Sequence, residues 1–357
     1  MKNWNDYLLA HGGRAATDLV DGQSLAFSDF GQSVGVSSLA DGFVAAVTDQ
    51  GLIAVSGEDA ARFLHGQLTN DVEHLPTDQA RLAGYCTPKG RLQASFLMWR
   101  DSESIFLQLP RAIQAPLQKR LAMFVMRAKA KLADATDAAA NAAVLGIGGT
   151  KGAAVLEQLV GALPAAPYGK TDGPHGTVIR LPDALGAARY QWLTTAEAAQ
   201  AAWPALSSQL AVGGNDAWQL SAIHAGVPSI TGKTQEQFVP QMINFELLGA
   251  VNFKKGCYPG QEIVARSQYL GKLKRRAVLV GIDGAAAHAG DEVFAASDPG
   301  QPSGMVVNAA PNGSGGTDAL VEMKLAAMEE GDLHLGSATG AALRIMPMPY
   351  ALDALDL

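Results

Sequence analysis

The sequence has only two cysteines in 357 residues, Cys86 and Cys257, and they lie too far apart to form a CxxC pair. Two thiols provide no disulfide framework, and they are too few for a four-thiolate zinc or iron–sulfur site within one chain. This scarcity is typical of a protein from a reducing compartment.

Long apolar runs are also missing. The first residues, MKNWNDYLLAHGG, include no apolar stretch of signal-peptide length, and no later run approaches the length of a membrane span. We therefore expect a cytoplasmic protein. The net charge of −7 and the pI near 5.5 argue against nucleic-acid binding over the whole surface, although they allow a local basic patch.

A glycine-rich phosphate loop of the Walker or Rossmann type is absent, and so is a Ser-His-Asp order. Apolar residues are plentiful: 48% of the residues are hydrophobic and 17% are charged. A chain of this length and composition buries a large core and is expected to form two or three domains.

The segment from residue 42 to residue 134 predicts one α+β lobe. Two strands, FVAAV and LIAVS, are expected around the turn at 48–51, and early carboxylates favour a helix start just after them. Hairpin strands on either side of 88–90, a further strand and an amphipathic helix over 112–126 follow, before a last strand closes the unit. This order is typical of the ferredoxin-like, split βαβ arrangement.

A second, fainter copy of this order follows between residues 142 and 225, without a repeat in the sequence itself. From residue 277, short apolar runs between glycine- and proline-rich turns predict a small β-barrel or sandwich. The expected fold class is α+β, with two ferredoxin-like (βαββαβ) lobes and a C-terminal small β-barrel. The expected domains are the N-terminal segment with the first lobe, the second lobe, a segment that carries a cysteine motif, and the barrel: residues 1–135, 136–240, 241–276 and 277–357.

The cysteine motif reads KKGCYPGQEIVAR and spans residues 254–266. Pro259 suits the first position of a helix, which places Cys257 two residues before a helix start, where free N–H groups and the helix dipole favour an anion. Lys254 and Lys255 add positive charge. Such surroundings lower a thiol pKa from about 8.5 to between roughly 3.5 and 7.5. The pattern predicts a reactive thiolate; the alternative is a buried cysteine acting as a small hydrophobe beside a tight turn.

Glu262 and Arg266 lie four residues apart in the expected helix. They suit a plain i,i+4 ion pair on the surface, or one or both of them line a ligand pocket. Residue type alone leaves both interpretations open.

The stretch KGCYPGQE closely resembles the K-G-C-Y-x-G-Q-E signature of the YgfZ family. GEDAARFLHGQLTNDV (57–72) resembles the family's N-terminal motif, and YCTPKGR (85–91) resembles the turn that follows it. FVPQMINFELLGAVNFKKGC leads into the signature as it does in the family, and GKLKRR follows it. The final barrel matches only in its pattern of short strands.

YgfZ proteins are folate-binding relatives of the glycine-cleavage T-protein, linked to maintenance of iron–sulfur enzymes and to tRNA modification. The resemblance implies two ferredoxin-like lobes and a barrel around a central channel that holds tetrahydrofolate, with Cys257 carrying the thiol chemistry. The positions that match the family's functional motif are Lys255, Gly256, Cys257, Tyr258, Gly260, Gln261 and Glu262.

Two departures from the related T-protein bear on the activity. The T-protein carries a catalytic aspartate shortly after the glycine of the corresponding turn, whereas the residues after Gly90 are RLQAS, without a carboxylate. The group needed to activate the amine is missing, which argues against aminomethyl transfer to folate. Ala222 stands where many relatives carry an arginine. His224 is either a replacement for one of the usual contacts or a satisfied helix histidine.

Four further residues are candidates for the channel. Asn70 and Asp71 follow the first helix and either reach the ligand or build a C-terminal turn. Tyr85 and Arg91 flank the turn at 88–90, where the ring could stack on a pterin and the guanidinium could contact a glutamate tail. The alternative for both is packing at the surface of the hairpin.

A short basic run, Lys272, Lys274, Arg275 and Arg276, follows the signature. Most such runs are solvated faces, and contact with tRNA or a partner protein is the minority interpretation. The expected partners are a folate and iron–sulfur client enzymes such as a tRNA methylthiotransferase; neither direct tRNA contact nor a membrane is expected.

The resemblance thus implies a tetrahydrofolate-binding accessory protein that assembles or repairs iron–sulfur clusters in client enzymes, including tRNA-modifying ones, through Cys257. One alternative is a folate-dependent aminomethyltransferase or demethylase of the T-protein type. Another is a folate sensor or scaffold without catalysis.

Overall fold

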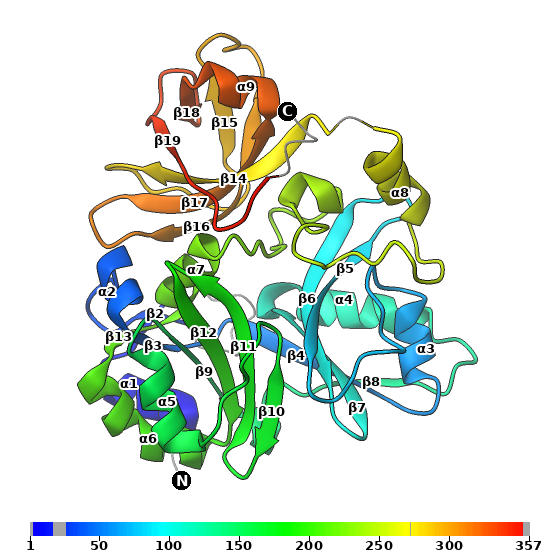
Figure 1. Cartoon of the computed structure of the whole chain (residues 1–357), viewed down its shortest axis with the longest axis vertical. Helices are drawn as coiled ribbons and strands as arrows, with labels where there is room; N and C mark the ends of the chain where they lie inside the picture. The colour runs from blue at the N-terminus through cyan, green and yellow to red at the C-terminus, as the bar shows by residue number, and fades with distance from the viewer. Residues whose placement is uncertain (1–2, 17–25, 272, 353–357) are drawn as a thin grey trace.

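The computed structural model describes residues 3–16, 26–271 and 273–352, whose strands form three large sheets and one two-stranded ribbon. Figure 1 shows two lobes side by side, the first at the right and the second at the lower left, with the C-terminal sheet above them. Among the described residues, no helix combines the length and the apolar character that a membrane span requires.

The first lobe is an antiparallel sheet of five strands covered by two helices on one face. Alternate strand residues point to opposite faces, so Ile53 and Val55 pack under the helices while Leu52 joins the central core. Phe63, Leu64 and Leu68 face the lobe's core, as their helical spacing predicts. In sheet order the elements are β5 (Ala80–Cys86), β6 (Leu92–Arg100), β7 (Ser104–Pro110), β4 (Gln50–Ser56) and β8 (Lys131–Asp134), with α3 (Ala60–His65) and α4 (Arg111–Met123).

The second lobe is a six-stranded sheet whose outer face is covered by helices from both ends of its sequence (Figure 1). Trp4 of the N-terminal helix stacks edge-on against Trp203, with ring centroids 5.6 Å apart. In sheet order the strands are β10 (Lys170–Gly173), β11 (Gly176–Ala184), β12 (Ala187–Thr194), β9 (Ala143–Gly148), β3 (Phe43–Ala46) and β13 (Ala211–Gly213), covered by α1 (Trp4–Ala10), α5 (Gly152–Val160) and α6 (Ala196–Gln209).

The strands FVAAV and LIAVS both form, but they enter different sheets. β3 pairs antiparallel with β9 and parallel with β13 of the second lobe, whereas β4 pairs with β7 and β8 of the first lobe. The turn at 48–51 therefore connects the two lobes. The expected boundary at residue 135 groups α1 and β3 with the first lobe, while their side chains pack in the core of the second. β3 lies far in the sequence from its partners β9 and β13, so no local sequence pattern predicts that they pair.

The C-terminal sheet has six strands and is nearly closed into a barrel, because an isolated bridge between His334 and Ala342 brings its two end strands together. Most of its strands follow the short apolar runs that predicted them. In sheet order the elements are β18 (Leu333–Leu335), β15 (Glu292–Ala295), β16 (Gly304–Pro311), β17 (Thr317–Lys324), β14 (Arg275–Ile282) and β19 (Leu343–Met346), with α9 (Leu325–Glu330).

The observed fold is therefore a mixed α+β fold with a barrel-like C-terminal sheet. The lobes contain five and six strands rather than four, so their ferredoxin-like description stays a prediction. The elements that connect the three sheets are β1 (Arg14–Ala15), β2 (Phe27–Asp29), α2 (Val36–Asp41), η1 (Ala139–Asn141), α7 (Asn215–His224), η2 (Pro240–Ile243) and α8 (Gln261–Tyr269).

The basic run after the signature is a solvated face only in part, because Lys274 is exposed whereas Arg275 and Arg276 are paired. Arg275 is paired with Glu322, which is almost completely buried, and Arg276 is itself 2% exposed and paired with Glu246. The two arginines open β14 and fasten it to its surroundings, so the solvated-face prediction is wrong for them. Lys272 lies outside the described residues.

α7 lies between the second lobe and the barrel, and a buried polar contact at its end joins the two. His224 Nε2 lies 2.7 Å from Asp318 Oδ2 on β17, and Asn312 donates to the other carboxylate oxygen. Burial works to raise the pKa of Asp318, but the bonds from His224 and Asn312 hold it below its usual value. His224 is thus a satisfied helix histidine that connects α7 to the barrel.

We expect Asp318→Asn to lower the free energy of unfolding by about 2 kcal/mol near neutral pH, since it weakens a charge-assisted hydrogen bond. The depressed pKa means that this stabilisation is complete above the pKa of the unfolded carboxyl and is lost as pH falls through the folded value. The difference from wild type should therefore shrink below about pH 4. Urea unfolding across pH measures it, with the exposed Asp283→Asn as the control. A difference in unfolding free energy between Asp318→Asn and wild type that stays constant down to pH 2 would contradict the stabilising role of the ionised Asp318.

Candidate functional site

The signature loop reaches its helix through a left-handed glycine. Gly260 has φ +80° and caps α8, which begins at Gln261. Pro259 therefore lies outside the helix, and Cys257 lies four residues before it rather than two. The prediction of the helix start was wrong because Pro259 fits a turn before an αL cap as well as a first helical position.

The left-handed cap places Gly260 against the turn of the YCTPKGR motif. A Cβ at Gly260 would lie 2.4 Å from the Thr87 carbonyl oxygen and 2.7 Å from Gly90 Cα, and Gly90 itself has φ +71°. Two glycine backbones thus meet without room for a side chain between them. This contact explains why both motifs contain a glycine at these positions.

Lys255 fastens the signature loop to the end of α3. Its ammonium group donates to the carbonyl oxygens of His65 at 2.6 Å and Leu68 at 3.0 Å, and it lies 4.8 Å from the ring centroid of Tyr258. Carbonyls at a helix C-terminus carry partial negative charge, so a cation is stabilised there. Burial nevertheless lowers the pKa of Lys255 to about 8, against the opposing effect of nearby acidic groups that include Cys257.

The two cysteines lie in opposite environments. Cys86 is 1% exposed, and burial raises the pKa of its thiol to about 12. Cys257 is exposed at the surface of the signature loop. The interpretation of Cys257 as a buried small hydrophobe is therefore wrong, and Cys257 is the thiol that a reagent or partner can reach.

Asn70 and Asp71 occupy the turn after α3 and line a pocket together with Asn252 of the segment that leads into the signature. Asn70 donates to the carbonyls of Leu82 and Gly249, both at 2.7 Å, so its side chain holds three segments together. Asp71 contacts two histidines, as described below. Both residues thus build the turn and also border a pocket.

A second cavity lies between the two lobes and the barrel. Its volume is about 170 Å³, and it shares Leu82 and Tyr168 with the pocket at Asn70. Its wall combines flat aromatic surface with polar groups, among them Asp49, Gln108, Arg189, Gln191 and Trp218. A small number of polar groups on an otherwise apolar wall is typical of a small-molecule site.

Tyr168 stands at the junction of the two lobes in a strained conformation. Its φ is +64°, unusual for a bulky residue, and its carbonyl accepts a bond from the Ala80 amide of the first lobe. Its hydroxyl is shielded from water and has no hydrogen-bond partner among the described residues. Burial raises the pKa of this hydroxyl, with Arg189 as an opposing charge.

Arg189 is 2% exposed yet lines the cavity. Its guanidinium donates to the Ser221 hydroxyl at 3.0 Å and lies 4.6 Å from the Trp218 ring centroid. Within the part of the chain that the structure describes, no carboxylate lies at ion-pair distance from it. Burial lowers the pKa of Arg189 to about 10. Asp183 acts on Arg189 as a counter-charge only from beyond ion-pair distance, and a buried guanidinium without a direct ion pair favours an anionic or carbonyl-rich ligand.

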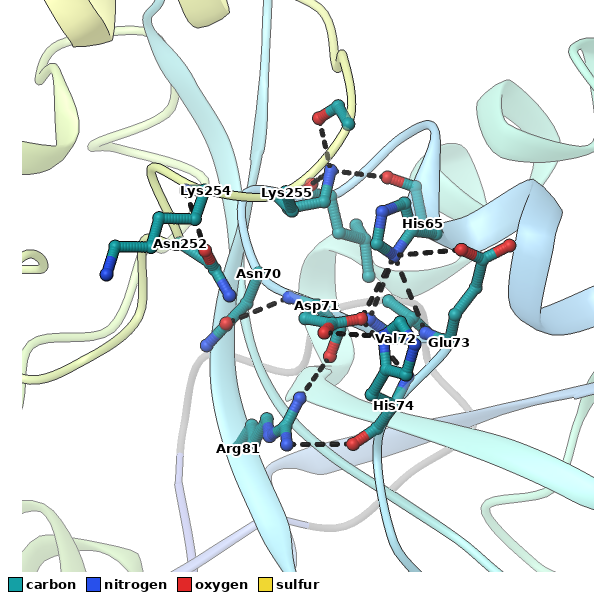
Figure 2. Close-up of polar contacts among 12 residues, drawn as sticks. His65, Asn70, Asp71, Val72, Glu73, His74, Arg81, Asn252, Lys254 and Lys255 are labelled. Atoms are coloured by element: carbon teal, nitrogen blue, oxygen red, sulfur yellow. Dashed lines mark hydrogen bonds and ion pairs between the residues drawn. The ribbon is translucent and has the colours of Figure 1, made fainter.

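The residues predicted from the motifs do not line this cavity. Tyr85 is buried in the core of the first lobe, and Arg91 is exposed and donates to the Gln237 carbonyl. Glu262 and Arg266 are exposed on α8 without forming the expected ion pair. Of the predicted residues, Asn70 and Asp71 line the pocket that they share with Asn252, and Lys255 contacts the end of α3 near them (Figure 2).

Sequence reasoning missed Tyr168, Arg189 and Trp218. The one available signal was a charged residue, Arg189, at the start of the apolar strand RYQWLT. For a metal, the described ranges contain no group of three His, Cys, Asp or Glu side chains arranged to hold an ion.

Comparison with known proteins defines the class of the fold. Residues 43–173 match the family model described as the GCVT N-terminal domain. The structure is similar to the crystal structure of glycine cleavage system aminomethyltransferase T from Bartonella henselae, with a TM-score of 0.75 over 96% of each chain at 16% identity. The chain therefore has the fold of the glycine-cleavage T-protein.

Curated relatives show which proteins with this fold the sequence resembles. The chain is 29% identical over 308 residues to the tRNA-modifying protein YgfZ of Yersinia enterocolitica, covering 85% of this chain and 91% of the relative. It is 29% identical over 309 residues to the protein of the same name from Serratia proteamaculans, with the same coverage. These matches confirm the resemblance to the YgfZ proteins that the motifs indicated.

Gly260→Ala should lower the free energy of unfolding by about 3 kcal/mol, because an alanine would be strained at φ +80° and would also collide with the backbone of the facing turn. Gly331→Ala is the matched control, since Gly331 has φ +77° but no atom within 4 Å of a new Cβ, so it should lose only about 1 kcal/mol. Thermal or urea unfolding measures both. Equal losses would show that the contact with the Gly90 turn contributes nothing.

Proposed function

We propose that this protein binds a tetrahydrofolate in the central cavity and supports the assembly or repair of iron–sulfur clusters in client enzymes, including tRNA-modifying ones, through the Cys257 thiol. The observation that supports the proposal is a pair of features: a cavity between the lobes that is lined by the unpartnered Tyr168 hydroxyl and the Arg189 guanidinium, and an exposed cysteine in the signature loop.

The cavity residues fit a folate. A folate has a flat heterocycle, an amide and terminal carboxylates. The heterocycle would stack on the Trp218 ring, the amide would bond to the unpartnered Tyr168 hydroxyl, and a carboxylate would pair with the Arg189 guanidinium. These three residues would bind and orient the ligand. When bound, the folate supplies a carrier for one-carbon groups.

The surface beside the cysteine supports contact with a client protein. α8 and the residue after it expose large apolar side chains: Ile263 is 36% exposed, Tyr269 69% and Leu270, which follows the helix, 81%. Exposed apolar surface next to a functional group is typical of a protein interaction site. Relatives named tRNA-modifying proteins favour an enzyme of tRNA modification, such as a methylthiotransferase, as one client.

A T-protein type of aminomethyl transfer is the second candidate, and one observation favours it. No carboxylate follows Gly90, but Asp49 brings one to the cavity wall from the turn between β3 and β4, where burial raises its pKa. Formation of methylenetetrahydrofolate from an aminomethyl donor would establish this activity. The accessory function predicts that none forms.

In a strain that lacks this protein, Cys257→Ala should leave iron–sulfur enzyme activity at the level of the strain without it, because the variant has no reachable thiol. Cys86→Ala is the matched control and should restore activity, since the buried Cys86 thiol cannot reach a client. Complete restoration by Cys257→Ala would overturn the thiol role and favour a folate sensor or scaffold.

Tyr168→Phe should weaken tetrahydrofolate binding about three- to tenfold, the value of one hydrogen bond, without lowering stability, because the hydroxyl has no partner in the protein. Calorimetric titration under anaerobic conditions measures the affinity. Tyr350→Phe is the control: its hydroxyl donates to Gly226 at 2.7 Å, so that change should lower stability and leave affinity unchanged. Unaltered binding by Tyr168→Phe would place the ligand elsewhere.

A further inference from the structure

His65, the last residue of α3, faces the signature loop next to Cys257. The Lys255 ammonium is held 2.6 Å from the His65 carbonyl, which fixes the loop against the end of the helix. A Cβ built on Gly256 would lie 3.6 Å from His65 Nε2, so this ring nitrogen lies beside Gly256, the residue that precedes Cys257. Figure 2 shows the ring between the signature loop on one side and Asp71 on the other.

The opposite ring nitrogen faces a carboxylate. His65 Nδ1 lies 3.1 Å from Asp71 Oδ1 and 3.9 Å from Glu73 Oε2, while the amides of Val72 and Glu73 lie at 3.4 and 3.5 Å. The amides would require an unprotonated Nδ1, and the carboxylate requires a protonated one. The carboxylate is closer, and an unprotonated nitrogen would be repelled by it, so we assign the proton to Nδ1. Nε2 is then unprotonated and lies beside Gly256 of the signature loop.

Asp71 is itself held in place as an anion. His74 bonds to both of its oxygens, through the ring at 2.9 Å and the amide at 3.1 Å, and Arg81 donates to its carbonyl at 2.8 Å. Partial burial works to raise the pKa of Asp71, but the bonds from His74 and the neighbouring rings hold it below its usual value. Asp71 therefore stays ionised at neutral pH and can stabilise an imidazolium.

We propose that His65, oriented by Asp71, accepts the proton of the Cys257 thiol. In this step the S–H bond breaks, an Nε2–H bond forms, and the pair becomes a thiolate beside an imidazolium that Asp71 stabilises. His65 is the proton acceptor and Asp71 is a positioning residue. The inference rests on the proposed thiol role of Cys257, and it assigns the origin of that thiol's reactivity.

The charged groups that face this pair come from three segments. Asp71, Glu73 and His74 belong to the turn after α3, Lys255 and Cys257 to the signature loop, and Arg81 to β5. Lys255 is bound to carbonyl oxygens, so it contributes charge rather than proton transfer. His65 is the neutral base that faces the loop beside Cys257.

The test is the rate of Cys257 alkylation by iodoacetamide between pH 5 and pH 10, followed at that residue by mass spectrometry. At pH 7, His65→Gln should slow alkylation about tenfold, which corresponds to a rise of one unit in the thiol pKa, and should move the profile to higher pH. Asp71→Asn should produce a smaller shift in the same direction. His288→Gln, an exposed barrel histidine, is the control and should change nothing.

A fold-preserving His65→Gln variant with an unaltered pH profile would overturn the proposal. A second measurement needs no change at His65: its ring should titrate at lower pH in Cys257→Ala than in wild type, because a neighbouring thiolate stabilises the imidazolium. Identical titration in the two proteins would also overturn it. Neither readout depends on client enzymes, so failure of the biological function of Cys257 would remain distinguishable from failure of the pair.

Discussion

The candidate site depends on one partly buried contact, that of the Lys255 ammonium with the carbonyl oxygens of His65 and Leu68 at the end of α3. This contact joins the signature loop to the N-terminal motif, two segments about 190 residues apart in the chain. Because the cation is partly desolvated, it is stable only where several oxygens surround it. The same contact holds His65 against the loop and leaves Cys257 at the surface.

The site has two parts with different physical character. The cavity between the lobes has walls that are held in place by the fold. Tyr168 is kept at a positive φ by hydrogen bonds to both lobes, and Arg189 is buried beside Trp218. The signature segment is exposed: its loop carries a thiol at the surface, and apolar residues of α8 are open to solvent. Such a division suits a protein that binds a small molecule inside and meets a partner outside.

Local pattern predicted the parts of the fold that local forces determine. The helical spacing of Phe63, Leu64 and Leu68 placed them correctly in a core, and the short apolar runs after residue 277 predicted most barrel strands. The local sequence pattern failed to predict features that depend on contacts between segments far apart in the chain. The pairing of β3 with β9 and the ion pairs of Arg275 and Arg276 have no counterpart in the neighbouring residues.

The sequence by itself determined the family resemblance, the turn-forming glycines and the identity of the thiol, because these depend on residue type and close spacing. Only the tertiary structure decided what surrounds them. Gly260 needs its left-handed conformation because another glycine backbone, that of Gly90, approaches it, and His65 becomes a candidate base because folding places it between Asp71 and the signature loop. The cavity arises from the packing of three sheets, so its lining residues share no motif.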